Sequence, residues 1–306
     1  MKVPNYAFVE NSKKFFILSL LLIAVSIIGV PVLGVSLDIQ FSGGAIIAYS
    51  FEGELDSADV TQTAGELTGV PISVQQSTDL ATGTPTMVIS LPGGDSLTSE
   101  QMVALNNGMA LAFPGNNLQV ESITNVSATM GTEFLQKSLI AVAFASLLVV
   151  LFVAIRFKRI GGFSAGITGV IALVHDVIIV FGVHVIAGIP LSGNFIAVVL
   201  TVLGYSINDT IVIYDRVREN KRLYGDKLPL AQLMDKSINQ SLRRSVNTSI
   251  STVACMAVVA VVALVFGVDT IVTFALPMIV GLIAGSYSSI FIAGPLWVRW
   301  QERAVV

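Results

Sequence analysis

Six long and mainly apolar runs divide this chain, and each is long enough to cross a bilayer as a helix. At 1.5 Å per residue, about 20 residues span the roughly 30 Å hydrocarbon core. The chain has 306 residues and is only 12% charged, whereas soluble domains are typically about a quarter charged. We therefore predict an α-helical polytopic membrane protein with six spans, at residues 15–34, 138–155, 162–189, 195–214, 246–268 and 270–297.

Basic residues predict how these spans are oriented, because Lys and Arg near the ends of spans stay on the cytoplasmic side. No Lys or Arg occurs between residues 35 and 136. We predict that both termini are cytoplasmic, that residues 35–136 are external, and that the first run is a retained helix of a cell-membrane protein rather than a cleaved signal. The basic groups fall at alternate ends of successive runs: Lys13 and Lys14; Arg156, Lys158 and Arg159; residues 216–244; Arg299 and Arg303.

The external segment has the pattern of a small α+β domain. Strand-like runs at 45–51, 72–76, 86–91 and 118–123 alternate with helix-like runs at 57–67, which opens on a Ser N-cap signal, and 96–113. The order βαββαβ predicts a ferredoxin-like domain. We therefore predict three parts: the N-terminus with the first span at residues 1–34, the external domain at 35–136, and a five-helix membrane domain at 137–306 with a cytoplasmic loop at 215–245. Eleven acidic residues and no basic ones fit either a cationic partner or a solvated surface.

The cytoplasmic stretch 215–239 is charged and predicted to be helical. Its apolar residues recur at helical spacing, which fits an amphipathic helix lying in the membrane interface or a simple connector. These residues are Leu230, Leu233, Met234, Ile238 and Leu242.

Asp209 is the residue in the spans that most needs an explanation, because a charged group near the bilayer centre costs roughly 2.5–3.5 kcal/mol. It lies six residues before Asp215, about 9 Å below the predicted cytoplasmic end of its helix, within reach of a long arginine. Burial disfavours its charge while Arg243 or Arg244 favours it, so the acid could gain and lose a proton. The alternative is a permanent ion pair that fixes helix packing.

A polar stripe follows Arg244 along the fifth span. Asn247, Ser251 and Cys255 come at i+3, i+7 and i+11, on one helix face. Such a stripe holds helices together or lines an ion path. Cys255, the single cysteine, offers neither a disulfide nor a metal cluster and is predicted to be a small core residue.

His175, Asp176 and His184 are the ionisable residues of the third span. His175 and Asp176 are about 100° apart on a helix, so we expect only one of them to face a given neighbour. Asp176 could join a proton relay or hold the fourth span through Ser206 or Asn208. His184 is predicted to be an interfacial side chain near the outer end.

Four segments together resemble the SecF family of protein-export membrane proteins. The most specific is LGYSINDTIVIYDRVREN at 203–220, which includes Asp209, Asp215 and Arg216. The other three, LDIQFSGG at 37–44, ALVHDVIIV at 172–180 and SLRRSVNTSIST at 241–252, follow the family's order along the chain.

The resemblance implies half of a resistance-nodulation-division-type unit that SecD completes. It implies a role in protein translocation with the SecYEG channel, acting on an unfolded chain and driven by protons or sodium, with Asp209 and Arg244 in the ion path and a second acid from SecD. Alternatives are a half-transporter for small molecules or lipids, and an assembly factor without ion flux. We expect no enzyme activity, cofactor or metal. We expect membrane lipid as a partner and, at a net charge of −3, no binding of nucleic acid.

Overall fold

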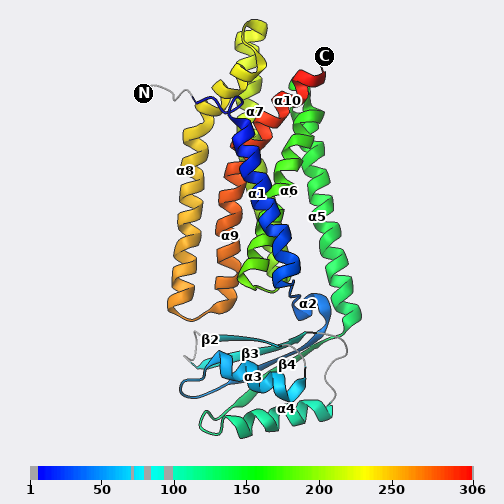
Figure 1. Ribbon diagram of the computed structural model, residues 1–306, viewed down its shortest axis with the longest axis vertical. Coiled ribbons are helices and arrows are strands. Elements are labelled where there is room, and N and C mark those ends of the chain that lie inside the picture. The colour runs from blue at the N-terminus through cyan, green and yellow to red at the C-terminus, as the bar shows by residue number, and fades with distance from the viewer. Residues whose placement is uncertain (1–5, 70–71, 79–83, 93–98, 305–306) are drawn as a thin grey trace.

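A computed structural model describes residues 6–69, 72–78, 84–92 and 99–304. Figure 1 shows a long helical bundle above a small sheet domain, with both chain ends at the end of the bundle that lies away from the sheet. In the described part of the chain, six helices are long and apolar enough to cross a membrane. The structure thus contains the six long apolar helices that the sequence predicted, as expected for a multi-pass membrane protein.

The spanning helices are α1 (Ser12–Leu33), α5 (Ala128–Arg156), α6 (Gly162–Ala187), α7 (Gly193–Tyr224) and α8 (Leu230–Val265), with a sixth span that begins at α9 (Asp269–Ser288). This last span continues through a π-helical turn (Ser289–Ala293) into α10 (Gly294–Ala304).

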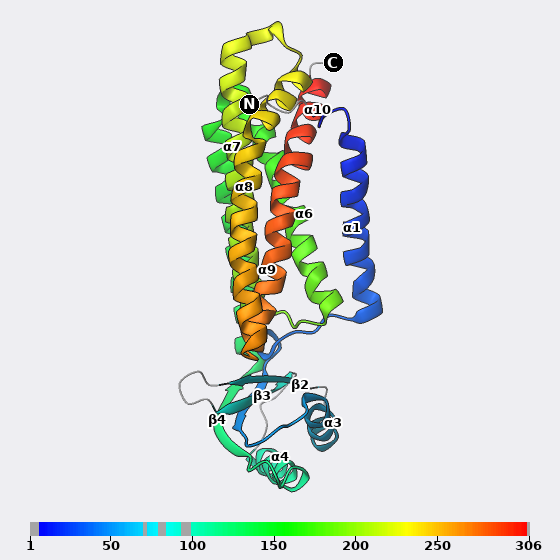
Figure 2. The same ribbon diagram turned by 90° about the vertical axis from the view of Figure 1, so that its left-hand side faces the viewer.

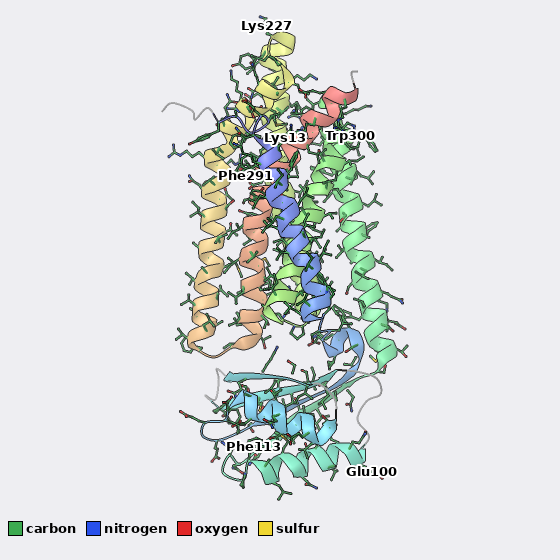
Figure 3. All side chains as sticks on the ribbon, in the orientation of Figure 1. Lys13, Glu100, Phe113, Lys227, Phe291 and Trp300 are labelled. Atoms are coloured by element: carbon green, nitrogen blue, oxygen red, sulfur yellow. The ribbon has the colours of Figure 1, made fainter. Side chains whose placement is uncertain are left out.

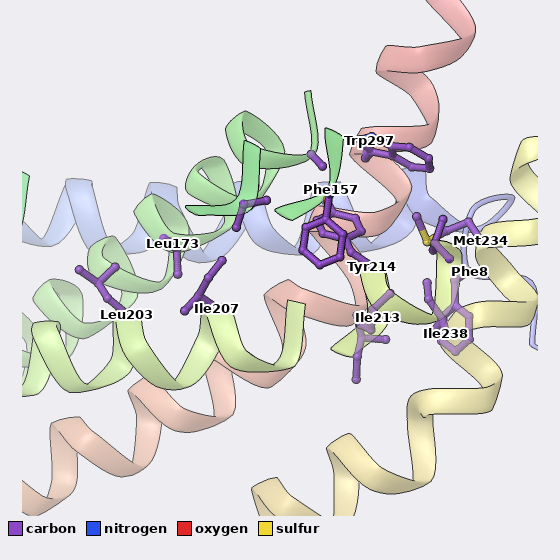
Figure 4. Packing of buried hydrophobic residues seen from close by; sticks show 14 of the residues in the cluster. Phe8, Phe157, Leu173, Leu203, Ile207, Ile213, Tyr214, Met234, Ile238 and Trp297 are labelled. Carbon is purple, nitrogen blue, oxygen red and sulfur yellow. The ribbon is translucent and has the colours of Figure 1, made fainter. Parts of the chain in front are cut away.

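Several helices extend beyond the apolar runs that predicted them. α7 continues to Tyr224 and α8 already begins at Leu230, so most of the predicted loop 215–245 is helical. Leu233, Met234 and Ile238 are fully buried in the main core cluster of the bundle. The interpretation of this stretch as a helix lying in the membrane interface is therefore wrong, because its apolar stripe packs on protein. Figure 4 shows Met234 and Ile238 beside Phe8 in this cluster.

The sheet domain follows the order β1 (Gly44–Ser50), α3 (Ser57–Thr68), β2 (Ser73–Thr78), β3 (Pro85–Pro92), α4 (Ser99–Ala112) and β4 (Gln119–Val126). A four-residue helix, α2 (Ile39–Ser42), precedes it. The described strands form an antiparallel sheet in the order β2-β3-β1-β4. Residues 96–98 of the predicted second helix lie outside the described residues. Asp56, rather than the predicted Ser57, caps α3 by accepting a hydrogen bond from the Ala58 amide.

Alternation along β1 explains how this domain is held together. Ala45, Ile47 and Tyr49 are buried while the residues between them are only partly buried, as expected for a strand with one face on a core. Both views place α3 and α4 on the side of the sheet that faces away from the bundle (Figures 1 and 2). Tyr49 donates a hydrogen bond to Asn106 Oδ1 on α4 at 2.5 Å, and burial raises the pKa of this phenol to about 12.

Small residues let the spanning helices approach closely. A Cβ on Gly182 of α6 would lie 2.6 Å from the Ser26 Cβ of α1, and one on Gly281 of α9 would lie 2.5 Å from Val202 Cγ2 of α7. Close backbone contact at small residues is the usual means of helix association in membranes. A Cβ on Gly281 would also lie 2.8 Å from Val180 Cγ2 of α6, so this glycine lets α6, α7 and α9 meet around the polar residues described below.

Two single-residue predictions are wrong. Cys255 is exposed on the outer surface of α8 rather than in a core. His184 is buried rather than interfacial, with Nδ1 3.0 Å from the Val180 carbonyl oxygen and its ring edge-on to Phe195. Hydropathy indicates depth along a helix but not which side faces the other helices, and both errors come from that.

Candidate functional site

Two neighbouring stripes of polar side chains run along α7, and they face different helices. Tyr205 and Asp209 form one stripe, and Ser206 and Thr210 form the other. Residues four apart lie on one helix face, whereas adjacent residues are about 100° apart. α7 therefore carries two polar clusters, one toward α8 and the other toward α6, with α9 reaching both.

Asp209 is buried between α7, α8 and α9, with 3% of its surface exposed. Ser245 and Ser286 lie next to its carboxyl group, and the positive charge of Arg244 acts on it. Even so, Asp209 Oδ2 and Ser245 Oγ are both buried without a well-formed hydrogen bond to any described residue. A buried acceptor without a partner is costly, so this carboxyl group is open to a proton, an ion or a donor from elsewhere.

A chain of hydroxyl groups leads from this carboxyl group toward the sheet domain. Ser286 is hydrogen-bonded to Ser249 one turn along α8 from Ser245. Tyr205 in turn donates to Ser249 Oγ at 3.2 Å. Hydroxyl groups both donate and accept, so this row can pass a proton along or solvate an ion.

Asp176 lies in the second cluster and is completely buried. Ser206 of α7 and Ser288 of α9 donate to its Oδ2 at 2.7 Å and 2.8 Å. His175 Nδ1 lies 3.0 Å from Oδ1. This carboxyl group, unlike that of Asp209, is fully used, and it joins three helices.

His175 and Asp176 both contact α9, so the expectation that only one could face a given neighbour is wrong. The His175 ring lies against Tyr287, with centroids 6.0 Å apart, while Asp176 bonds the next residue, Ser288. Two successive residues of one helix can meet two successive residues of another where the helices pack closely. His175 Nε2 is buried without a partner among the described residues.

The π-helical turn lies directly beside this cluster. Ser289 donates to the Ser206 carbonyl oxygen at 2.9 Å and is also 2.9 Å from the Thr210 hydroxyl oxygen. Tyr214 donates to the Ala293 carbonyl oxygen at 3.3 Å. Figure 4 shows Tyr214 packed close to Phe157 and Trp297. Isolated π-helical turns often occur at functional sites, and here Tyr214 bonds a carbonyl at the end of one.

Most of the predicted polar stripe on α8 faces outward. Arg244, Asn247 and Ser251 are exposed, as is Asn208 on α7. Ser251 bonds the Asn247 carbonyl oxygen of its own helix at 2.9 Å. We call these four exposed residues, Arg244, Asn247, Ser251 and Asn208, the polar face. Lipid cannot satisfy these polar groups.

Asp215 and Arg216 lie apart from both clusters, at the end of α7 away from the sheet. Asp215 pairs with Arg156 of α5 at 3.2 Å and with Arg218 at 3.0 Å, while Arg216 pairs with Glu219. The serines of α9 were not predicted as site residues. A signal was present, since SYSS at 286–289 places four hydroxyl side chains, three of them serines, within an otherwise apolar run.

Comparisons with known proteins agree over almost the whole chain. Residues 109–303 match the family described as protein export membrane protein SecD/SecF, C-terminal. The chain is 32% identical to protein translocase subunit SecF of Alicyclobacillus acidocaldarius, covering 99% of this chain and 95% of that protein. It is 34% identical to SecF of Calditerrivibrio nitroreducens, covering 95% and 93%.

Longer relatives contain the chain as one part. Protein translocase subunit SecDF of Bacillus subtilis is 30% identical over 98% of this chain, which spans 38% of that protein. The crystal structure of SecDF from Thermus thermophilus, titled a translocon-associated membrane protein, is similar with a TM-score of 0.79 and 31% identity, over 98% of this chain and 39% of that one.

Proposed function

This chain belongs to the SecD/SecF family of protein-export membrane proteins, and we propose that it is a SecF-type subunit that promotes protein export across the cytoplasmic membrane. In this proposal it works beside the SecYEG channel on an unfolded, translocating chain, converts ion flow into movement, and carries out no covalent chemistry. The observation that carries this proposal is the buried Asp209 carboxyl group, whose Oδ2 has no hydrogen-bond partner among the described residues and which feels the positive charge of Arg244 on the polar face.

The partner that covers the polar face is proposed to be SecD. Arg244 and Asn247 are exposed in a spanning helix, where contact with lipid is unfavourable, and a second helical bundle would satisfy them. SecDF relatives, in which this chain matches about two-fifths of a longer protein, support such a neighbour. A SecD helix on this face would bring a second acid close to Asp209.

The sheet domain is proposed to be an external, ferredoxin-like domain, residues 35–136, with both termini in the cytoplasm. The strand order β2-β3-β1-β4 around two helices supports the ferredoxin-like assignment. The absence of Lys and Arg from residues 35–136 of the sequence supports the external side. Movement of the bundle would reach this domain through α5, whose start packs on α2 by stacking Phe134 on Phe41.

Ion coupling is proposed to work through the protonation of Asp209. When Asp209 is ionised, Arg244 is attracted to it, and a proton or sodium ion that binds the carboxyl group weakens that attraction. Movement of one charge across 100 mV supplies about 2.3 kcal/mol, enough to bias helices with two arrangements. Asn247 and Ser251 would line the entrance together with SecD, and Asp176 would stabilise the packing of α6, α7 and α9 as they shift.

The test is reconstitution of the chain with SecD and SecYEG in vesicles, measuring the release of a translocating protein with and without an ion gradient. We expect Asp209→Asn and Arg244→Ala to abolish the stimulation by the gradient. The matched control Glu219→Gln, on the same helix but in an exposed pair with Arg216, should keep it.

Each alternative function predicts a different outcome. If the Asp209→Asn variant still copurifies with SecD and the gradient still fully stimulates protein release, the ion path is refuted and an assembly factor is favoured. A wild-type complex that moves a small molecule but does not stimulate protein release would favour a half-transporter. Proton and sodium gradients applied separately identify the ion.

A further inference from the structure

An open groove lies at the end of the bundle that carries both chain termini. It is formed by the end of α5, the turn that follows it, the start of α6, and α10, and its cavity volume is about 640 Å³. Trp300 lines this groove and is labelled at that end of the bundle in Figure 3. Volumes of about 300–1,000 Å³ are usual for small-molecule sites.

The groove walls are apolar and face outward. Ile155 is 77% exposed and Phe163 is 68% exposed, and Leu151 continues the same surface along α5. These residues belong to spanning helices, so the hydrocarbon of the bilayer is their natural environment. The inner part of the groove therefore fits an acyl chain.

Lys158 is the cationic side chain at the rim of the groove among those that the structure describes. Lys158 lines it and is exposed, and among the described residues it forms no salt bridge. Arg156, two residues earlier, is engaged by Asp215. A lysine above an apolar wall, with a tryptophan beside it, is the arrangement found at membrane interfaces, where the ammonium group reaches the headgroup level.

Close helix packing fixes the shape of the groove. A Cβ on Gly162 would lie 2.2 Å from the Ala154 carbonyl oxygen, so only glycine lets α6 turn this tightly against α5. Gln301 of α10 donates to Ser164 Oγ of α6 at 2.7 Å. The groove is thus preformed by packed backbone and a hydrogen bond between helices.

We infer that this groove binds one anionic phospholipid, with its phosphate at Lys158 and an acyl chain along Ile155 and Phe163. The groove lies beside α5, whereas the polar face lies mainly on α8, on the opposite flank of the bundle (Figure 1). The SecD partner proposed above therefore does not cover it, and the inference is independent of the proposed function. The positive charge at the rim selects an anionic over a zwitterionic headgroup.

The test is native mass spectrometry of the full chain in detergent with added phosphatidylglycerol or phosphatidylcholine of the same acyl chains. Wild type should retain one phosphatidylglycerol in preference to phosphatidylcholine. Lys158→Gln should weaken phosphatidylglycerol retention about five-fold and leave phosphatidylcholine unchanged. Phe163→Ala, an exposed change that spares the fold, should weaken both. Lys14→Gln, an exposed lysine at the same end but on α1, is the matched control and should change neither.

Two results would overturn the inference. The first is retention of phosphatidylglycerol that is unchanged by Lys158→Gln or reduced as much by Lys14→Gln. The second is displacement of the lipid by glycerol phosphate at equal concentration, which would identify the site as one for a soluble phosphate compound.

Discussion

The N-terminal segment is tied to the first part of α8 by Asn239, and removing this side chain should loosen the segment. Asn239 accepts a hydrogen bond from the Tyr6 amide at 3.0 Å and donates to the Tyr6 carbonyl oxygen at 2.8 Å. The Val9 amide donates to Asp235 at 2.9 Å, and Phe8 is buried against Phe291. The segment therefore lies across the turn of α8 that precedes Arg244.

The expected size of the effect follows from these contacts. Asn239→Ala removes the two hydrogen bonds to the N-terminal segment, of about 1 kcal/mol each. About 2 kcal/mol corresponds to roughly 30-fold more frequent local opening of that segment. Tyr6 is 58% exposed, so water replaces part of the lost bonding and 30-fold is an upper bound. The Val9 bond and the burial of Phe8 remain, so the segment should open more often without being released.

Hydrogen exchange followed by mass spectrometry measures this opening. Peptides covering residues 6–12 should exchange up to about 30-fold faster, with the middle of α8 unchanged. Gln240→Ala is the control, because Gln240 bonds Asn220 rather than the N-terminal segment. If residues 6–12 keep their wild-type exchange, or if both variants accelerate them equally, Asn239 does not hold this segment.

Two further predictions concern the sheet domain and the helix contacts. Tyr49 should titrate near pH 12, as measured by ultraviolet difference absorbance between wild type and Tyr49→Phe, and titration near pH 10 would contradict its burial. Because its folded pKa is raised above the unfolded value of about 10, its contribution to stability is complete below pH 10 and falls as the pH rises toward 12. Gly182→Ala should lower the melting temperature by separating α1 from α6, at a cost of about 1–3 kcal/mol, whereas Gly204→Ala, where an added Cβ would contact nothing within 4 Å, should not; equal melting temperatures would show that α1 is not closely packed.

Hydropathy and charge predicted the spans but not where their helices end. The apolar run that ends at residue 214 belongs to a helix that continues to Tyr224. Charged residues such as Arg216 and Glu219 are good helix formers in water, so the helix does not end where the apolar run ends. The stripe that includes Leu233 and Ile238 has the same spacing whether it faces lipid or protein. Its burial depends on the N-terminal segment and α10, which no local pattern reveals.

The acids of the candidate site could be predicted because burying a carboxyl group in an apolar helix is costly. The geometry around them could not, because it depends on how neighbouring helices pack. A carboxyl group in an apolar run identified Asp209 and Asp176, since burying an acid is expensive wherever the helix lies. Ser206 was predicted as one possible partner of Asp176 and does bond it. The other partners of the two acids were not predicted, because serines such as Ser286 and Ser288 cost little in a membrane helix. The direction of the stripe after Arg244, outward rather than inward, also depends on the positions of whole helices.

Together, the two clusters make α9 the helix that connects both acids. Ser286 lies by Asp209, Ser288 bonds Asp176, and all of these contacts fall within one turn of α9. Because hydrogen bonds tolerate only a few tenths of an ångström of change, a displacement of α9 that improved one cluster would strain the other. The π-helical turn beginning at Ser289 follows at once, and its extra residue gives this part of the helix an alternative, α-helical hydrogen-bonding pattern. A change in the charge of Asp209 would therefore be felt at Asp176 through α9, although the two carboxyl groups share no direct contact among the described interactions.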